Sequence, residues 1–269
     1  MKIFDSHCHP QSPQYKNDRE EVMRRALDAG VFMICVGTDL KMSKEAIALA
    51  NKFNGVWASV GLHPNDNLDE RYNQNDYKRL LAEPKVVAIG EVGLDYYRTT
   101  DPGKKKFQRE RFEKQIELAR ESEKPLIIHC RDAHDDMISI LKNWPALGKP
   151  KARPGKLEIG DFPGGVIHSF TGTYDDAKKY LELGFFLGFN GIVTFTHAYD
   201  EVVKNIPLKQ MLLETDAPYL APEPYRGKRN EPVNVKEVAA HIAKLRGGVV
   251  SEVESQTAQN TIALFKLQL

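Results

Sequence analysis

The sequence predicts a single α/β domain folded as an eight-stranded (β/α)8 barrel of the TIM type. Eight short apolar segments recur along the chain, amphipathic segments of helical length separate them, and no change of composition divides residues 1–269. Strands buried on both faces are short and continuously apolar, and their alternation with helices is typical of barrels of about 250 residues. A doubly wound open sheet is the alternative that the same alternation permits.

Each predicted strand is a short apolar run, and several are rich in Val and Ile, as buried parallel strands are. The eight predicted strands are residues 2–5, 32–36, 56–60, 86–89, 125–128, 165–167, 185–189 and 210–213.

Amphipathic segments between these runs carry helix start and stop signals. Asp18 is a predicted N-cap, Gly30, Gly55 and Gly184 follow three of the segments, and Pro125 cannot continue the longest one. The predicted helices are residues 19–29, 43–54, 105–124, 132–143, 174–183, 235–245 and 252–265.

One stretch interrupts this rhythm. Residues 145–164 contain four prolines and several Gly and Lys residues, and the strand–helix pattern resumes after them. We therefore interpret 145–164 as a surface insertion, not as a linker between domains.

The composition excludes several classes of protein. Lys and Arg number 38 and Asp and Glu 37, which leaves a net charge of +1 and argues against a uniformly basic nucleic-acid coat. Three cysteines without metal-finger spacing indicate a reducing compartment. No apolar run approaches the roughly 18 residues of a membrane span, and no signal peptide opens the chain. We expect a cytoplasmic monomer with no membrane association and no obligate protein partner.

Ionisable residues follow five of the predicted strands. His7 and His9 end the first strand, and alternation along a strand predicts that they share a face with Asp5. Any of them alone could be a structural residue, but the carboxyl ends of parallel barrel strands meet on one rim, where such enzymes keep their active sites. The other strand-end residues are Glu91, His129, His168 and Asp216.

Such a cluster predicts bound cations. Uncompensated ionisable groups crowded on one rim would desolvate and repel one another, and metal ions would offset this. Six ligands are too many for one tetrahedral ion but suit two ions that share a bridging carboxylate, an arrangement typical of hydrolases. Imidazole and carboxylate ligands admit Mg²⁺, Mn²⁺, Zn²⁺ or Ni²⁺.

Seven sequence blocks in order give the chain a close resemblance to the TatD family of metal-dependent deoxyribonucleases, within the amidohydrolase-like barrels. The resemblance covers nearly the whole chain, and it departs from the family's usual pattern at Ser169, where Cys is frequent, and in the length of the 145–164 insertion. The blocks are DSHCH (5–9), VGLHP (60–64), GEVGLDYY (90–97), IHCR (128–131), IHSFTG (167–172), ETDAPYLAP (214–222) and PYRGKRNEP (224–232).

The resemblance implies a two-metal enzyme that hydrolyses DNA phosphodiester bonds, typically as a 3′→5′ exonuclease on single strands. It implies one metal held by His7, His9, Glu91 and Asp216. It implies a second metal held by Glu91, His129 and His168, with Glu91 bridging the two.

Three further roles follow from chemistry. Asp216 is the candidate general base, because a carboxylate beside the activated water can take its proton. His63 is predicted to bind the scissile phosphate or donate a proton; the alternative is a rim histidine bonded to the backbone. Arg131 is predicted to clamp a phosphate; the alternative is an ion pair with Asp132 or a rim carboxylate.

Cationic and aromatic residues near the predicted rim fit a single-stranded nucleic acid, whose phosphates need cations and whose bases stack on rings. Asp5 is assigned a supporting role, orienting a ligand histidine. The predicted substrate-binding residues are His63, Arg131, Tyr96, Phe170, Tyr225, Arg226 and Arg229, with Tyr97, Tyr219 and Lys228 beside them.

Two other functions remain open from the sequence. The same barrel and ligand set would also serve a metal-dependent hydrolase of small esters, lactones or amides. A non-catalytic metal-binding scaffold is less favoured, because all six ligand positions are occupied by ligand residues.

Overall fold

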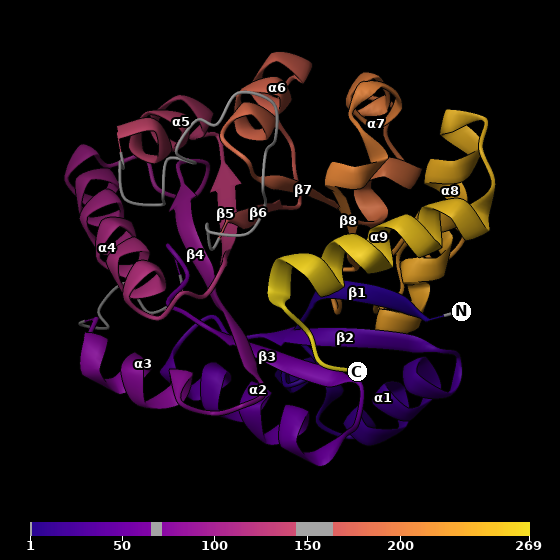
Figure 1. The fold of residues 1–269 in the computed structure, drawn as a ribbon, viewed down its shortest axis with the longest axis horizontal. Helices are drawn as coiled ribbons and strands as arrows, with labels where there is room; N and C mark the ends of the chain where they lie inside the picture. Colours follow the sequence, from indigo (N-terminus) through magenta and orange to yellow (C-terminus); the bar gives the residue numbers. More distant parts are fainter. Residues whose placement is uncertain (1, 66–71, 144–163) are drawn as a thin grey trace.

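A computed structural model describes residues 2–65, 72–143 and 164–269, and in these residues eight parallel strands form one sheet in the order β1 to β8 (Figure 1). This confirms the predicted (β/α)8 architecture. The strands are β1 Ile3–Cys8, β2 Val31–Val36, β3 Val56–Val60, β4 Val86–Asp95, β5 Leu126–Arg131, β6 Gly165–His168, β7 Phe186–Phe189 and β8 Met211–Leu213.

Backbone hydrogen bonds join the last strand's segment to the first. The Asp216 N–H donates to the His7 carbonyl at 2.9 Å, and the His9 N–H donates to the Ala217 carbonyl at 2.7 Å. These bonds lie just beyond β8 and at the end of β1, so the carboxyl ends of the strands meet around one rim.

Helices follow the strands and surround them in Figure 1, while α9 crosses the central region. Two helices, α3 and α7, were not predicted, because they are short and polar and bury few apolar residues. No helix in the described ranges has the length and apolarity to cross a membrane. The helices are α1 Arg19–Asp28, α2 Leu40–Lys52, α3 Gln74–Leu81, α4 Pro102–Glu121, α5 His134–Asn143, α6 Tyr174–Glu182, α7 Asp200–Asn205, α8 Val235–Arg246 and α9 Val250–Phe265.

Several helix starts differ from the predictions; α2 begins at Leu40, three residues before its predicted start, because Asp39 caps it. The Asp18 side chain makes no capping bond to α1; its carboxylate instead accepts hydrogen bonds from Arg229. Helix α4 begins at Pro102, three residues before the predicted start, because Asp101 caps it and proline is favoured in a first helical turn.

The apolar core has two layers. One lies inside the barrel, where Phe4, Trp57 and Phe186 pack with other strand residues and with Phe265 from α9. The larger layer fills the space between the barrel and its helices. The inner layer is formed by residues near the start of several strands, so apolar side chains fill the amino end of the barrel. Polar side chains occupy the carboxyl end.

Strands β1 and β4 each contain a β-bulge, an extra residue that changes the direction of the side chains around it. Between Asp5 and Cys8, β1 advances three residues while β2 advances two. Between Ile89 and Val92, β4 likewise gains one residue on β5. Bulges of this kind change which side chains face a given side, and each contains a predicted ligand, His7 in β1 and Glu91 in β4.

The predicted surface insertion at 145–164 lies outside the described residues except for its last residue, Gly164. The Gly164 carbonyl accepts a hydrogen bond from the Leu126 N–H at 3.1 Å, immediately before β6 begins.

Candidate metal centre

A cleft of about 1100 Å³ opens at the carboxyl end of the barrel. Loops that follow all eight strands line it, as expected for the functional face of this fold. His7 is fully buried beneath it. Of the six predicted metal ligands, those that line the cleft are His9, Glu91, His129, His168 and Asp216.

The two histidines of β1 converge on one point. Their Nε2 atoms lie 3.0 Å apart. The His9 Nδ1 lies 2.7 Å from the Val36 carbonyl, which only accepts, so Nδ1 carries the hydrogen and Nε2 faces the cluster. The Asp216 Oδ1 lies 3.8 Å from the Nε2 of His7 and 3.5 Å from that of His9.

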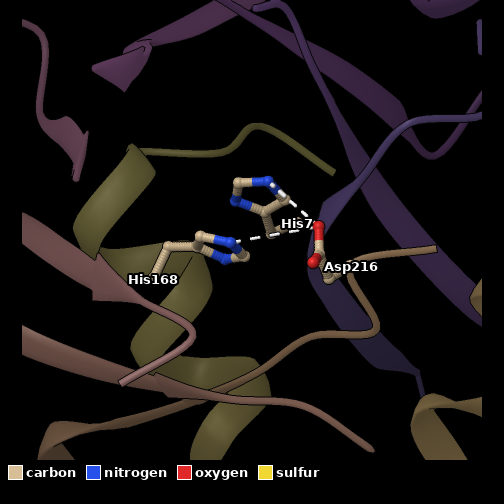
Figure 2. Close-up of side chains that lie close together, drawn as sticks. All are labelled: His7, His168 and Asp216. Atoms are coloured by element: carbon tan, nitrogen blue, oxygen red, sulfur yellow. Dashed lines mark ion pairs between the residues drawn. The ribbon is translucent and has the colours of Figure 1, made fainter. Parts of the chain in front are cut away.

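Asp216, just beyond β8, and His168, at the end of β6, also lie in this cluster. Figure 2 shows His7, His168 and Asp216 turned toward one another, and the His168 Nε2 lies 3.9 Å from the Asp216 Oδ1. The rings of His7 and His168 stack with centroids 3.5 Å apart. Residues more than 160 positions apart in sequence therefore share one site.

Glu91 lies between two sets of histidines, one facing each oxygen. Its Oε2 is 3.4 Å from the Nε2 of His7 and 3.7 Å from that of His9. Its Oε1 is 2.8 Å from the Nδ1 of His129 and 3.8 Å from the Nε2 of His168. A carboxylate with this arrangement can serve two cations at once.

Two buried carboxylates that the sequence analysis did not assign hold ligand histidines from behind. The Asp95 Oδ2 lies 3.2 Å from the His129 Nε2, and the Glu214 Oε1 lies 3.0 Å from the His168 Nδ1. Such carboxylate–histidine pairs fix the ring and its tautomer at metal centres. Asp95 lies in the block GEVGLDYY and Glu214 in the block ETDAPYLAP. In the sequence, each is visible only as a second acidic residue close to a predicted ligand.

The charges of the cluster compensate one another. Burial raises the pKa of Glu91, but its histidine neighbours, chiefly His63 and His129, hold that pKa well below its usual range. Burial, together with the charge of His168, lowers the pKa of His7 to about 4, so the His7 ring is neutral at neutral pH. Burial opposes protonation of His168, but Glu214 raises its pKa to about 10.

The donor set fits divalent metal ions. Among the residues that the structure describes, three groups have ligand atoms within 4.8 Å of one another: His7, His9 and Glu91; His7, His168 and Asp216; and His63, Glu91 and His129. Imidazole nitrogen and carboxylate oxygen together suit Zn²⁺ and Mn²⁺, and the carboxylates suit Mg²⁺.

The ring of His63 contacts both Glu91 and the backbone of Asn65. It lies in the cleft wall with its Nε2 3.6 Å from the Glu91 Oε1. The Asn65 N–H donates to the His63 Nδ1 at 3.2 Å. The Nδ1 therefore faces the Asn65 backbone, and the Nε2 faces Glu91.

Arg131 also faces the cleft, where its guanidinium stacks on the ring of Tyr97. Its guanidinium lies 3.9 Å from the ring centroid of Tyr97, and both residues line the cleft. Tyr97 is 61% exposed, so its outer face is accessible to a ligand.

Two predicted stacking residues lie elsewhere. The Tyr96 hydroxyl donates to Asp136 at 2.6 Å and accepts from Arg109 at 3.0 Å, so the ring faces α4 and α5. Phe170 is 1% exposed and packs in the core against Tyr180. The Tyr96 hydroxyl is thus engaged with other side chains and Phe170 is buried, whereas Tyr97 lines the cleft.

The arginines of the predicted substrate-binding segment 224–232 mainly contact other parts of the protein. Arg229 pairs with Asp18 at 2.5 Å, and the Arg226 guanidinium lies 3.7 Å from the Phe195 ring centroid. Within the described part of the chain, neither arginine lines the cleft, nor does Tyr225. Tyr219, 53% exposed, is the aromatic residue of this region that lines it.

Asp5 supports the backbone and not a histidine ring. Its carboxylate accepts hydrogen bonds from the His7 N–H at 3.2 Å and from the N–H of Thr215 at 2.9 Å. The bulge after Asp5 separates its direction from that of His7, which simple alternation did not anticipate. Asp5 therefore ties the end of β1 to the segment that presents Asp216.

Comparisons with known proteins agree with this geometry. Residues 4–266 match the family model described as "TatD related DNase". The chain is 40% identical to the Bacillus subtilis protein YabD, described as an uncharacterized metal-dependent hydrolase, with 98% of this chain and 99% of YabD covered. It is 35% identical to the Klebsiella pneumoniae 3′-5′ ssDNA/RNA exonuclease TatD, with 99% of each covered.

A solved structure shows the same fold. The crystal structure of YJJV, a TatD homologue from Escherichia coli K12, superposes with a TM-score of 0.87 at 29% identity, covering 99% of this chain and 98% of that one. The family match, the relatives' descriptions and the ligand cluster lead to one conclusion: the chain belongs to the TatD-related DNase family and is a metal-dependent hydrolase acting on ester bonds.

Proposed function

We propose that this hydrolase uses two divalent ions to cleave phosphodiester bonds of single-stranded DNA, releasing nucleotides from the 3′ end. The observation that carries the two-metal part is Glu91, whose two oxygens face separate sets of histidines. His7, His9, Glu91 and Asp216 would hold one ion, and Glu91, His129 and His168 the other. Mg²⁺, Mn²⁺ or Zn²⁺ bound there would lower the pKa of a water and offset negative charge on the phosphate.

Asp216 is proposed as the general base. Its side chain is 16% exposed, so it reaches the cleft from within the cluster. Burial raises its pKa, but a hydrogen bond from His9 and the charge of His168 hold the pKa below its ordinary value. The carboxylate is therefore ionised and able to accept a proton from an attacking water.

His63 is proposed as a donor to the substrate and not as a ligand. The Asn65 N–H donates to the Nδ1 of His63, and the Nε2 lies 3.6 Å from the Glu91 Oε1 at the cleft wall. An N–H at this nitrogen would bind a phosphate oxygen or protonate the leaving oxygen. The position of His63 beside the proposed ligands supports a catalytic role.

The cleft wall supports a polyanionic, single-stranded substrate. Arg131 offers a guanidinium already oriented by Tyr97, and Arg98 and Tyr219 line the same cleft. Cations bind backbone phosphates, and exposed rings stack on unpaired bases. The K. pneumoniae relative is described as an exonuclease of single-stranded DNA and RNA, which supports the same class of substrate.

A strand-degradation assay tests the proposal. With Mg²⁺ or Mn²⁺, 5′-labelled single-stranded DNA is expected to shorten progressively from its 3′ end, and EDTA is expected to stop the reaction because the ions are removed. Small esters, lactones and amides are assayed in parallel. Intact DNA together with rapid ester hydrolysis would contradict the proposal and favour the small-substrate alternative.

A further inference from the structure

Two walls of the cleft face each other across the ligand cluster. In a closed barrel of eight strands, the loops after β4 and β5 lie across the rim from the loops after β8 and β1. Tyr97 follows β4 and Arg131 ends β5. Tyr219 follows β8, Gln14 follows β1, and all four residues line the cleft. A strand of nucleic acid that crosses the cluster would therefore contact both walls.

Each wall adjoins a different part of the cluster. The Tyr219 N–H donates to the Asp216 carbonyl at 2.9 Å, so Tyr219 lies in the turn that follows this proposed ligand. On the other side, Arg131 comes two residues after His129, and its guanidinium stacks on the ring of Tyr97. A phosphate held over the cluster would thus have Tyr219 on one side and the Arg131–Tyr97 pair on the other.

The walls differ in charge. Arg98 and Arg131 line the wall formed after β4 and β5, together with the acid Asp132. Among the residues that the structure describes, neither guanidinium has an ion-pair partner within 4.0 Å, so both are available to a substrate. Apart from the proposed ligands, the described lining residues after β1 and β8 are uncharged: Ser12, Pro13, Gln14, Tyr219 and Leu220.

Contacts between its two loops fix the uncharged wall. The Gln14 Nε2 donates to the Tyr219 hydroxyl at 3.4 Å, which joins the loop after β1 to the loop after β8. The Arg229 Nη1 donates to the Gln14 carbonyl at 2.9 Å, and the Arg19 Nε donates to the Pro10 carbonyl at 2.8 Å. Because these loops are held in place before substrate arrives, Tyr219 offers an exposed ring at little cost in ordering.

A DNA strand cut at its 3′ end is asymmetric in charge about the scissile phosphate. The terminal nucleoside beyond that phosphate carries no further phosphate, whereas each nucleotide before it adds one. Cationic side chains bind phosphates, and exposed aromatic rings stack on unpaired bases. The wall with two arginines therefore matches the upstream chain, and the uncharged wall matches the terminal nucleoside.

We infer that the two walls set the direction in which the strand lies across the metal centre. Tyr219 stacks on the 3′-terminal base, Tyr97 stacks on the penultimate base, and Arg98 and Arg131 bind the phosphates upstream. The inference rests on the proposed nuclease function and adds to it the residues that would select the 3′ end. These are binding residues, so their effect is measurable without cleavage.

The test is a set of binding measurements on single-stranded DNA that resists cleavage. A 5′-fluorescein decanucleotide with phosphorothioate linkages is titrated with Mn²⁺-loaded protein, and fluorescence anisotropy gives the Kd. Two further strands lack one base each, at the terminal or at the penultimate position. Wild type is compared with Tyr219→Leu, Tyr97→Leu, Arg98→Gln and Arg131→Gln.

Two controls make the same chemical changes away from the cleft. Phe107→Leu removes a ring that is 43% exposed on α4, and Arg120→Gln removes an exposed cation from the same helix. Both variants are expected to bind all three strands as wild type does, because neither residue lines the cleft.

In wild type, loss of either base is expected to weaken binding about tenfold, the usual effect of one stacking contact. In Tyr219→Leu, loss of the terminal base is expected to have no further effect, while loss of the penultimate base still costs about tenfold. Tyr97→Leu is expected to show the reverse. Arg98→Gln and Arg131→Gln are each expected to reduce the slope of log Kd against log salt by about 0.7, the loss of one phosphate contact.

Three outcomes would overturn the inference: Tyr97 coupled to the terminal base and Tyr219 to the penultimate base, abasic strands that bind wild type as tightly as the complete strand, or salt slopes unchanged in both arginine variants. Cleavage of ordinary DNA is assayed separately. The expected binding pattern without cleavage would refute the nuclease activity alone, whereas cleavage from the 3′ end with the opposite pattern would refute the strand direction alone.

Discussion

Glu91→Ala is expected to abolish turnover, and Glu91→Gln to reduce it by at least about a thousandfold, while the circular-dichroism spectrum stays that of wild type. Glu91 is 4% exposed and lies between both histidine sets, so alanine removes contacts on both sides of the centre. Glutamine keeps the shape but places an amide NH₂ against an imidazole nitrogen and removes the negative charge. The measurement is the rate of 3′-end cleavage at saturating Mn²⁺.

A conservative change elsewhere provides the control. Glu117 is exposed on α4, so Glu117→Gln makes the same chemical change without touching the cluster and is expected to retain wild-type turnover. Full activity in either Glu91 variant would remove its bridging role and with it the two-metal proposal.

His63→Ala is expected to lower kcat by about 10²- to 10⁴-fold, the usual contribution of a positioned proton donor, with little change in KM. The metal content of the variant is expected to equal that of wild type, because His63 is not among the proposed ligands of either ion. Steady-state kinetics and metal analysis on the same preparation provide the measurement.

The two readouts separate the possible roles of His63. A lower metal content would make His63 a ligand, since it belongs to one of the three groups able to hold an ion. Unchanged kcat and unchanged metal content would show that His63 has neither role, leaving the predicted alternative of a backbone-bonded rim histidine.

Much of the fold was predictable because the barrel strands are buried on both faces. Runs such as Val31–Val36 are apolar throughout, so their pattern can be recognised without knowing which strands lie beside them. Helix α3 has only eight residues and Tyr77 as its buried residue, so its apolar pattern is too short to stand out in the sequence.

That the proposed ligands would lie close together was predictable for a different reason. A buried parallel strand has no local need for a histidine or carboxylate at its end, so His129 and Asp216 are conspicuous there. The sequence does not reveal whether a residue next to a proposed ligand points into the cleft or away from it. The β1 bulge turns Asp5 away from the histidine side chains, and Tyr97 faces the cleft while Tyr96 bonds to Asp136.

Residues that support the centre are also difficult to find from the sequence. Gln115 reaches the Leu62 backbone across 53 positions, and Glu214 reaches the Ser169 N–H across 45. Both side chains are common in helices and loops, and only the tertiary contact distinguishes them. The same holds for Arg229, whose predicted phosphate contact is replaced by a pair with Asp18.

The most direct test of the account is a crystal structure of the protein grown with Mn²⁺, examined by anomalous diffraction. The account predicts two anomalous peaks at the carboxyl end of the barrel, both contacted by Glu91, with His7 and His9 at one and His129 and His168 at the other. A single peak, or peaks that Glu91 does not join, would contradict it.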